Sequence, residues 1–462
     1  MRTLEEADVL ARLALDNPWW RTGTVEAYVA ALPRRALFEA FFHRVNRPGG
    51  GPPLVLAGPR RVGKSVLIRQ IIARLIDAGT DPRGILYVSL DAPALHGLPL
   101  DRLVAVACAP DQPGFLFLDG LHHLRDGEAT VAALAAAQPS LRVVAGVAGG
   151  AAPRPRDGNL FVLPPLTFCE YLRFTGAERD LIEPMFFGKG TPMYVVRDMA
   201  ALNERFVHYV NGGGFPEAVL LRPAPGDAGH HLRNEVLAAL LHQDLPGLTG
   251  IASTPELNAL LALLARNTGR EVSIEAIAER AGIAKNTIRR YLDYLEASHL
   301  IIRMGRVHPE GGRFRRMRTF KVHLASPCLY AALFGPVAAD DPLFPALAES
   351  AIIGQWLASA DLPNLVYARL PEGSVDLVAL SPDTGRPAWA CALPGTDESV
   401  AGDATINGLI QFSRRNAPLR WIGATTRTQA ALKAHDGVEV WHRPASQYCY
   451  EVGRRVAEEV GA

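Results

Sequence analysis

With 462 residues, the chain is too long for one ordinary hydrophobic core, and its length predicts roughly two to four domains. It carries 48 lysines and arginines against 47 aspartates and glutamates, and this formal net charge of +1 argues against a surface that coats nucleic acid or membrane throughout. Hydrophobic residues make up 48% of the chain and charged residues 21%, a globular composition that excludes disorder and collagen.

The sequence lacks the signals of a membrane or secreted protein. It has no run of about eighteen uncharged apolar residues, and its first twenty residues are acidic and amphipathic. We therefore expect a cytoplasmic protein with no membrane partner. The basic residues are 43 arginines and only five lysines, so the position of each lysine is informative. The cysteines are scattered singly, without the spacing of a zinc site or a disulfide framework: Cys108, Cys169, Cys328, Cys391 and Cys449.

The chain begins with a helical pattern and continues with an alternating one. Residues 1–45 are predicted to form amphipathic helices, interrupted at Asn17-Pro18 and Pro33, before a Gly/Pro-rich stretch at 47–53. From 54 to about 166, short apolar runs alternate with helical patterns, which predicts a mainly parallel sheet with helices on both faces. The apolar runs are PLVLAG, ILYVSLD, GFLFLDG, LRVVAGV and NLFVLPPL.

A phosphate-binding pattern lies between the first of these strands and the next helix. Residues 58–65, GPRRVGKS, fit G-x-x-x-x-G-K-[ST], whose glycines let backbone N–H groups surround phosphates at a helix N-terminus. We expect Lys64 to reach the β- and γ-phosphates and Ser65 to bind Mg²⁺. The alternative is an ordinary glycine-containing turn. The predicted nucleotide-binding residues are Gly58, Pro59, Arg60, Arg61, Val62, Gly63, Lys64, Ser65 and Val66.

A carboxylate ends the apolar run at 115–119. Asp119 stands where a Walker B strand places the aspartate that orients the Mg²⁺ shell. The predicted catalytic group is therefore Lys64, Ser65 and Asp119, with Ser65 and Asp119 on the metal side. The next residue is Gly120, where many P-loop ATPases have the glutamate that polarises the attacking water. We expect tight nucleotide binding with slow or partner-dependent hydrolysis.

Two pairs of residues are secondary candidates in this region. His122 and His123 either help to position water or are ordinary residues at a strand end. Arg154 and Arg156 either act as arginine fingers, in cis or toward a neighbour, or are simply solvated. The strand before these arginines, at 144–150, has no polar side chain that can hydrogen-bond a γ-phosphate.

From 168 to about 267 the pattern is helical, and a helix-turn-helix pattern follows at 272–299. The glycines at 212–214 are expected to permit a close backbone approach between helices. Ser273 is expected to cap the first helix of the later pair, and Gly282-Ile283 to form the turn. The second helix has an apolar face at i, i+3, i+4 and i+7, formed by Ile288, Tyr291, Leu292 and Leu295.

Basic residues are concentrated after this turn. Between Lys285 and Lys321 the chain has ten basic and three acidic residues, in the layout of a winged helix with a hairpin tip at Gly311-Gly312. This pattern favours double-stranded DNA as a partner. The alternative is a winged helix that packs against other parts of the protein. The predicted DNA-binding residues are Lys285, Asn286, Thr287, Arg289, Arg290, Arg313, Arg315 and Arg316.

The order of these motifs resembles the bacterial and archaeal ATPases that join an AAA-type P-loop domain to a DUF4143 region. That region consists of a winged helix followed by a domain with a restriction-endonuclease-like fold. The matching segments are Asn17-Pro18-Trp19-Trp20, GPRRVGKS at Gly58, LDGLHHL at Leu118, PPLTFCEYL at Pro164, GGFPE at Gly213, HQDL at His242, RRYLDYLE at Arg289 and FKVHLASPCLYAAL at Phe320.

The resemblance implies an α/β protein of five parts and a preference for ATP. No guanine-specific N-K-x-D motif occurs in the chain. The expected parts are N-terminal helices at 1–45, a P-loop AAA-type ATPase domain with a parallel sheet at 46–170, a helical region at 171–265, a winged helix at 266–335, and a degenerate nuclease-like α/β domain at 336–462.

The nuclease-like part departs from the pattern that an active nuclease needs. Glu349 and Asp376 stand where the fold can place two metal-binding carboxylates, but Cys391-Ala392-Leu393 replaces the expected E-x-K. A scaffold or a docking surface is therefore favoured over a cleaving enzyme.

Three hypotheses about function follow. The leading one is an ATP-binding switch of the AAA type, with ATP and Mg²⁺ as cofactors, that couples nucleotide state to binding of DNA, a protein partner or further copies of the chain. The second is a hydrolysis-impaired binding module that uses ATP as a structural ligand or not at all. The third is a metal-dependent nuclease.

Overall fold

The computed structural model describes residues 6–47, 49–95, 98–107, 114–124, 126–148, 159–186, 193–221, 254–314, 318–400 and 404–461. These residues form two compact units: the first contains the described residues up to Leu163, and the second contains those from Pro164 to Glu459. Four predicted features lie outside the described residues, namely Arg154, Arg156, the HQDL segment at 242–245 and the pair Arg315 and Arg316.

The first unit is built on a parallel sheet of five strands in the order β2-β3-β4-β1-β5. Every strand pair is parallel, and the strands coincide with the five apolar runs that the sequence predicted. Near-continuous apolar runs are typical of strands that are buried on both faces. The strands are β1 (Leu54–Gly58), β2 (Ile85–Ser89), β3 (Phe115–Asp119), β4 (Arg142–Ala148) and β5 (Leu160–Val162).

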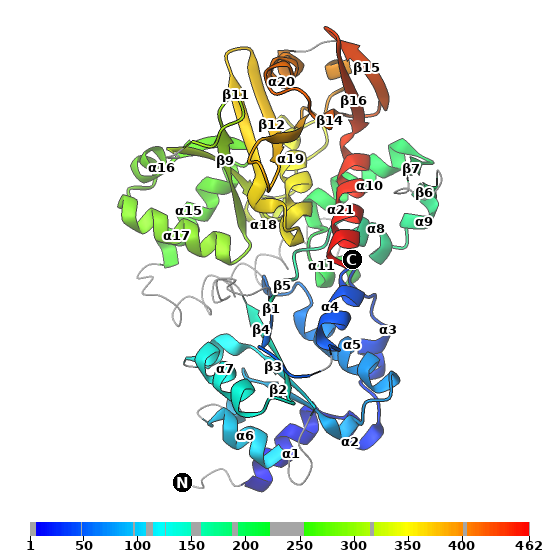
Figure 1. Cartoon of the computed structure of the whole chain (residues 1–462), viewed down its shortest axis with the longest axis vertical. Helices are drawn as coiled ribbons and strands as arrows, with labels where there is room; N and C mark the ends of the chain where they lie inside the picture. Colours follow the sequence, from blue (N-terminus) through cyan, green and yellow to red (C-terminus); the bar gives the residue numbers. More distant parts are fainter. Residues whose placement is uncertain are drawn as a thin grey trace. The chain divides into compact units, whose positions relative to one another are not determined.

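Helices cover both faces of this sheet (Figure 1). On one face, α1 (Glu6–Asp16), α6 (Leu100–Ala107) and α7 (Gly127–Ala137) share a hydrophobic core with alternate residues of β2, β3 and β4. On the other face lies α5 (Lys64–Asp77), against which α3 (Ala27–Ala31) and α4 (Phe38–Val45) pack. The prediction of helices on both faces of a parallel sheet is therefore confirmed.

The N-terminal segment around α2 (Trp19–Thr22) covers the open edge of β2. Asn17 Nδ2 donates to the Tyr87 carbonyl at 2.8 Å, and the Tyr87 N–H donates to Asn17 Oδ1 at 2.7 Å. The indole N–H groups of Trp19 and Trp20 both donate to the Ile85 carbonyl. Pairing an edge strand in this way removes a template for aggregation. The N-terminal helices thus belong to the same compact unit as the sheet.

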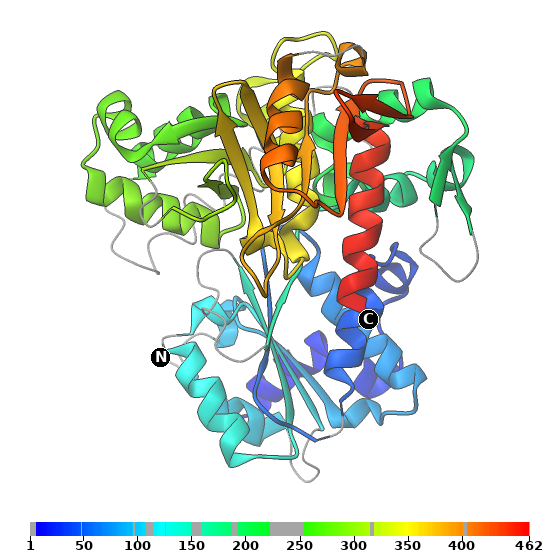
Figure 2. The ribbon, with the colours of Figure 1, turned by 45° about the horizontal axis from the view of Figure 1, so that its top comes forward.

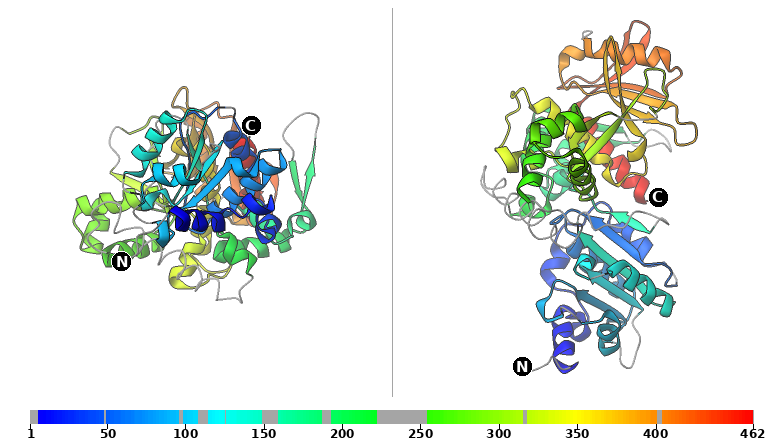
Figure 3. Two further views of the ribbon diagram at one scale, coloured as in Figure 1. Left: turned by 90° about the horizontal axis from the view of Figure 1, so that it is seen from below. Right: turned by 90° about the vertical axis from the view of Figure 1, so that its left-hand side faces the viewer.

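The second unit begins with a helical part from which a hairpin of two strands projects (Figure 3). Thr167 and Glu170 form a capping box at its first helix, since each side chain bonds the other's backbone N–H. At Gly214, an added Cβ would lie 2.1 Å from Ser326 Oγ, so the glycine permits a close backbone approach. The elements are α8 (Phe168–Phe174), α9 (Glu178–Leu181), β6 (Ile182–Met185), β7 (Met193–Val196), α10 (Met199–Gly212) and α11 (Pro216–Leu220).

The helix-turn-helix pattern forms as the sequence indicated. Ser273 Oγ accepts a hydrogen bond from the Ala276 N–H at 3.0 Å, and Gly282 ends that helix with φ of 68°. The apolar face of the next helix is buried, with Ile288, Tyr291, Leu292 and Leu295 at most 1% exposed. The elements are α15 (Thr254–Arg266), β8 (Arg270–Ser273), α16 (Ile274–Ala281), α17 (Lys285–Ala297), β9 (Ile301–Val307) and β10 (Thr319–Leu324).

A sheet of nine strands unites these strands with the C-terminal ones, in the order β15-β16-β14-β13-β12-β11-β9-β10-β8. The junction is a parallel pairing of β9 with β11. One helix, α20, packs across β12 and β13 (Figure 2). The remaining elements are α18 (Cys328–Phe334), α19 (Phe344–Gly354), β11 (Leu365–Leu370), β12 (Gly373–Leu380), β13 (Pro387–Ala392), α20 (Ala404–Arg415), β14 (Trp421–Thr426), β15 (Ala431–His435), β16 (Val438–Pro444) and α21 (Ala445–Gly461).

Two properties of the described residues concern membrane spans and disulfides. None of the helices described there combines the length and the apolar character that a membrane-spanning segment requires. The four described cysteines, Cys169, Cys328, Cys391 and Cys449, are buried free thiols.

Candidate functional site

The loop between β1 and α5 has the backbone conformation that its glycines predict. Gly58 ends β1, and its backbone lies so close to Leu163 that an added Cβ would be 2.2 Å from the Leu163 carbonyl oxygen. Gly63 adopts φ of 92° directly before α5, and Arg61 also has a positive φ, of 62°. A left-handed backbone favours glycine at Gly63, whereas the close approach to Leu163 requires glycine at Gly58.

Lys64 lies at the first position of α5 and turns back over the loop. Its side chain is buried, and Nζ donates hydrogen bonds to the Gly58 carbonyl at 2.9 Å and the Pro59 carbonyl at 2.7 Å. Ser65 follows on the exposed side of the helix. Because α5 is 14 residues long, its N-terminus adds the partial positive charge of a helix dipole beside the ammonium group.

An arginine that sequence reasoning missed supports the loop from the N-terminal segment. Arg35 is 5% exposed, and its Nη1 donates to the Val62 carbonyl at 2.7 Å. A buried guanidinium on a loop carbonyl fixes the loop backbone from behind. Nothing in the local sequence distinguishes Arg35 from the other arginines, because its partner lies 27 residues away.

The predicted Walker B residue, Asp119, ends β3 at the same edge of the sheet. Only β4 separates β3 from β1, so the two strand ends are two strand spacings apart, about 10 Å. Gly146 of β4 is the residue paired with Asp119, and an added Cβ there would lie 2.9 Å from Asp119 Oδ1. The missing side chain at Gly146 therefore leaves room for the carboxylate to lie across β4.

A tyrosine on the neighbouring strand fixes the other oxygen of this carboxylate. Tyr87 of β2 donates its hydroxyl proton to Asp119 Oδ2 at 3.0 Å. Burial of Tyr87, together with the negative charge of Asp119, raises the pKa of the tyrosine hydroxyl well above its ordinary value. The hydroxyl therefore remains a donor at neutral pH and holds Asp119 in one orientation.

The residue after Asp119 has a backbone conformation that favours the glycine found there. Gly120 has φ of 86°, a left-handed conformation that a glutamate would adopt only with strain. His122 and His123 follow in a short 3₁₀ turn, with ring centroids 4.2 Å apart. The turn that follows Asp119 therefore depends on the left-handed backbone of Gly120.

These groups fit a Mg²⁺-triphosphate in their chemistry. An ammonium group and a helix N-terminus suit phosphate oxygens, while the Ser65 hydroxyl and the Asp119 carboxylate are oxygen ligands of the kind that Mg²⁺ prefers. When bound, the metal neutralises charge on the β- and γ-phosphates. Of the other predicted contact residues, Pro59 and Val62 are buried, Arg60 and Val66 are half-buried, and Arg61 is exposed.

The two carboxylates that the sequence suggested as metal ligands, Glu349 and Asp376, lie in the other unit, and a lysine lies between them. Lys321 Nζ on β10 donates to Glu349 Oε1 on α19 and to Asp376 Oδ1 on β12, both at 2.9 Å. Asp376 Oδ2 accepts the Leu393 N–H at 2.8 Å. The described residues contain no group of three or more His, Cys, Asp or Glu side chains able to hold a metal ion. Glu349 and Asp376 thus converge as the sequence suggested, but on an ammonium group.

The two carboxyl groups beside Lys321 have pKa values shifted in opposite directions. Burial raises the pKa of Glu349 to about 7, although Lys321 opposes that rise. Burial also acts to raise the pKa of Asp376, but Lys321 and the Leu393 N–H outweigh it and lower the pKa. Asp376 is therefore the ionised partner of Lys321, and Glu349 takes up a proton near neutral pH. His323 beside them stays neutral, because burial lowers its pKa to about 3.

The basic segment is less available than its composition suggested. Arg303 is paired with Glu296 and with Asp293, and Lys321 is buried in the cluster described above. The charge excess of the segment is therefore smaller at the surface than its composition indicates, because Glu349 and Asp376, which lie outside the segment, neutralise Lys321.

The predicted DNA-contacting residues fall into two groups. Lys285, Asn286, Arg289 and Arg290 are exposed on α17, Thr287 is half-buried there, and Lys285 lies 3.7 Å from Glu275. At the hairpin tip, Arg313 instead donates to the Pro363 carbonyl at 3.0 Å and to Asn364. An added Cβ at Gly311 would lie 2.6 Å from Asn416 Oδ1, so the tip packs against the C-terminal part of the same unit.

Comparison with protein families supports the resemblance stated for the P-loop region but not the one stated for the region that follows it. Residues 50–172 match the model of an AAA domain family, AAA_14, which supports a P-loop ATPase domain of the AAA type. Residues 203–339 match a domain of unknown function, DUF8612, so the resemblance to a DUF4143 region is not confirmed. A search of curated proteins gave no match to the chain.

Proposed function

We propose that this protein is an ATP-binding switch of the AAA type. Mg-ATP is held by residues 58–66 and Asp119, and the nucleotide state selects between arrangements of a P-loop domain at 46–170 and the parts that follow it. Those parts are a helical region at 171–265, a winged helix at 266–335 and a degenerate nuclease-like domain at 336–462. The γ-phosphate changes charge and metal coordination at the loop, which is the differential contact that a switch requires.

The geometry of the phosphate loop carries this proposal. Gly58 and Gly63 allow the backbone to turn inward, while Lys64 and the N-terminus of α5 bring positive charge to the same place. Asp119 lies at the same edge of the sheet, in the space left by Gly146. The match of residues 50–172 to an AAA domain family supports the same function independently.

Hydrolysis is proposed to be slow or to depend on a partner. The usual glutamate after the Walker B aspartate is replaced by Gly120, whose positive φ suits glycine. A water-positioning group must then come from another segment, from His122 or His123, or from a bound partner. An arginine from a second copy of the chain would add positive charge that stabilises the transition state.

Binding and turnover of Mg-ATP by the wild type and by Lys64→Ala test the proposal. We expect the substitution to weaken Mg-ATP binding at least about tenfold, because it removes the ammonium group at the phosphates. Isothermal titration calorimetry with the full chain measures the affinity, and phosphate release measures turnover. Lys433→Ala is the matched control, since Lys433 is an exposed lysine outside this loop. Equal affinity in the wild type and Lys64→Ala would contradict the proposal.

A hydrolysis-impaired binding module is the second candidate, and Gly120 is the observation that favours it. In that case ATP raises the thermal stability of the wild type but not of Lys64→Ala, and neither protein releases phosphate. A metal-dependent nuclease is the least supported candidate, because Lys321 occupies the space between Glu349 and Asp376. Mg²⁺-dependent cleavage of DNA that is lost in Asp376→Ala would reverse this ranking.

The output of the switch is proposed to be a protein partner or double-stranded DNA. For DNA, the exposed arginines Arg289 and Arg290 of α17 are the stronger candidates, because Arg313 is hydrogen-bonded within its own unit. Replacing both with alanine is expected to weaken duplex binding and to reduce its salt dependence by about one to two phosphate contacts. Arg313→Ala serves as the control, with little expected change. Unaltered affinity and salt slope in the Arg289→Ala/Arg290→Ala variant would remove DNA from the proposal.

A further inference from the structure

Half of the tryptophans of the chain line a pocket of about 420 Å³ in the second unit. It is lined by strands β13, β14 and β16, by one face of α21, and by β7. Of the six tryptophans in the sequence, three line this pocket, and a fourth, Trp356, stacks behind Trp389 with ring centroids 5.8 Å apart. This volume and an aromatic lining are typical of ligand sites.

The indoles are held in place by their neighbours. Trp421 packs edge-on to Trp389 at 5.9 Å and stacks on Tyr448 of α21 at 5.7 Å. Trp421 folds over Gly423, where an added Cβ would lie 2.0 Å from the indole ring. The glycine therefore makes room for the indole on the strand surface. Rigid aromatic walls lose little conformational entropy when a ligand binds.

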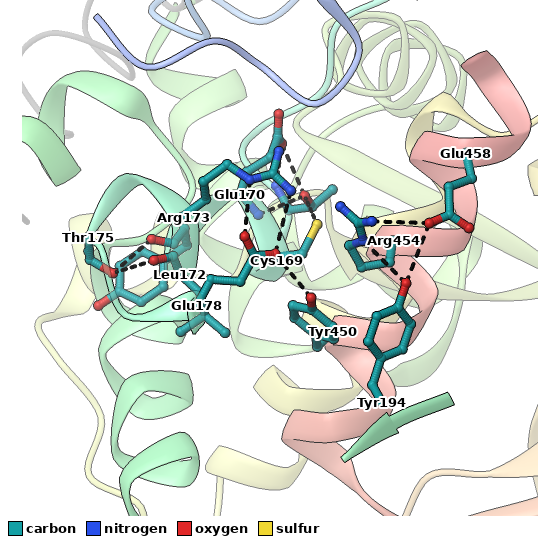
Figure 4. Close-up of polar contacts among 12 residues, drawn as sticks. Cys169, Glu170, Leu172, Arg173, Thr175, Glu178, Tyr194, Tyr450, Arg454 and Glu458 are labelled. Atoms are coloured by element: carbon teal, nitrogen blue, oxygen red, sulfur yellow. Dashed lines mark hydrogen bonds and ion pairs between the residues drawn. The ribbon is translucent and has the colours of Figure 1, made fainter. Parts of the chain in front are cut away.

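The two glutamates that line the pocket have hydrogen-bond partners within the unit. Glu458 is bonded by Arg454 at 3.2 Å and by the hydroxyl of Tyr194 at 3.4 Å, a group that Figure 4 shows together with the neighbouring Glu178–Tyr450 contact. Glu451 accepts a hydrogen bond from Gln447 at 2.9 Å.

The two lining arginines are likewise engaged. Arg455 lies 3.7 Å from Glu459, and the guanidinium of Arg443 lies over the ring of Trp441. With two arginines and two glutamates in its lining, the pocket has a formal charge of zero. A polyanion such as the phosphate backbone of a nucleic acid finds no excess positive charge here, so the pocket is suited to an uncharged group.

An apolar rim extends the pocket over two hairpins. Met193 lies directly opposite Met185 in the β6–β7 hairpin, and Trp441 directly opposite Leu432 in the β15–β16 hairpin. Residues opposite one another in an antiparallel pair point to the same face. These four side chains are between 38% and 49% exposed. Tryptophan, tyrosine, methionine and arginine are the residue types enriched at the centres of protein–protein interfaces.

We propose that this pocket is a docking site for a partner polypeptide that inserts one uncharged aromatic or branched aliphatic side chain between the tryptophans. Residues on either side of that anchor lie over the rim formed by Met185, Met193, Leu432 and Trp441. The neutral lining matches an uncharged anchor, and the exposed rim matches a polypeptide better than an isolated small molecule. This site goes beyond the proposed function, because it requires neither ATP binding nor hydrolysis.

Selection of random linear peptides displayed on phage against the full wild-type chain tests the proposal. We expect the selected peptides to share an aromatic or branched aliphatic residue. Calorimetry then compares synthetic copies of these peptides on the wild type, Trp441→Ala, Met193→Ser and Tyr28→Ala. Trp441→Ala and Met193→Ser each change an exposed rim residue, on different hairpins, so that one variant serves if the other does not fold. Tyr28, at 66% exposed, is a matched exposed aromatic residue in the first unit.

We expect Trp441→Ala to weaken peptide binding about tenfold or more, Met193→Ser to weaken it less, and Tyr28→Ala to leave it unchanged. Failure to select any peptide with a shared apolar residue, or equal binding to the wild type and both rim variants, would overturn the proposal. A single-stranded oligothymidylate that binds the wild type but not Trp441→Ala would also overturn it, since a stacked base would then be the occupant. Self-association in sedimentation that is lost in Trp441→Ala would show a second copy of the chain there and would equally overturn it.

Discussion

Among the described residues each unit has one buried lysine, and the two differ in what their ammonium groups contact. Both are 8% exposed. Lys64 donates to two backbone carbonyls of its own loop, whereas Lys321 donates to the carboxylates of Glu349 and Asp376. A carbonyl oxygen carries only partial charge and is readily exchanged for a phosphate oxygen. A buried carboxylate cannot be released without leaving an uncompensated charge.

This difference shows how the same residue type lies at the proposed nucleotide site in one unit and in the core of the other. At Lys64 the acceptors lie 5 and 6 residues away on a glycine-containing loop. At Lys321 they lie on two elements, 28 and 55 residues further along the chain. These two hydrogen bonds of Lys64 are local, whereas those of Lys321 hold β10, α19 and β12 together.

The largest expected effect is that of Lys321→Ala on stability. The substitution leaves Glu349 and Asp376 buried without a cation, which costs about 3–5 kcal/mol of the free energy of unfolding. Urea unfolding followed by tryptophan fluorescence measures this change. Lys433→Ala, an exposed lysine of the same unit, is expected to change stability by about 0.5 kcal/mol or less. A loss below about 1 kcal/mol in Lys321→Ala would mean that the cluster does not hold the unit together.

Glu349→Gln tests the protonation of the cluster around Lys321 through the pH dependence of stability. Burial raises the pKa of Glu349 from 4.5 to about 7, so the folded state binds a proton that the unfolded state releases. Stability therefore falls as pH rises from about 4.5 to 7, by about 3 kcal/mol for this group, and Glu349→Gln removes that fall. His323, with its lowered pKa of about 3, has the opposite slope below pH 6.5.

The quantity to measure is therefore the difference in unfolding free energy between the wild type and Glu349→Gln at several pH values. We expect the variant to gain stability relative to the wild type as pH rises through that range. A difference that does not change with pH would show that Glu349 is ionised throughout.

Gly146→Ala is expected to have a smaller effect, confined to the first unit. The added methyl group would lie 2.9 Å from Asp119 Oδ1 and displace the carboxylate from its place across β4. We expect the affinity for Mg-ATP to fall about tenfold, which is roughly 1.4 kcal/mol, with little change for ATP measured with EDTA. Gly84→Ala is the control, because the nearest atom to its Cβ is 3.9 Å away. An equal loss with and without Mg²⁺ would indicate that Asp119 does not act through the metal.

Local patterns in the sequence predicted the local structure well. The five apolar runs form the five strands, Ser273 caps its helix, and the apolar stripe of α17 is buried. Each of these depends on neighbours within about one or two helical turns, and side-chain periodicity records such contacts directly.

The same patterns failed where charge was counted along the chain. The sequence assigned Lys321 to a basic segment, yet Lys321 is buried between the carboxylates of Glu349 and Asp376, which lie outside that segment. The burial of Lys321 depends on the pairing of β10 with β9 and of β9 with β11, which brings distant acidic residues to the same place. Net charge over a segment does not record such pairings.

By itself, the sequence determined the loop at residues 58–65, because its glycines act through backbone geometry next to a helix end within eight consecutive residues. It also determined which strand ends in Asp119. Only the tertiary structure decided that Gly146 makes room for that aspartate, that Lys321 lies between Glu349 and Asp376, and that three tryptophans line one pocket. The physical reason is that packing and ion pairing join residues tens of positions apart, and only strand order and register bring them together.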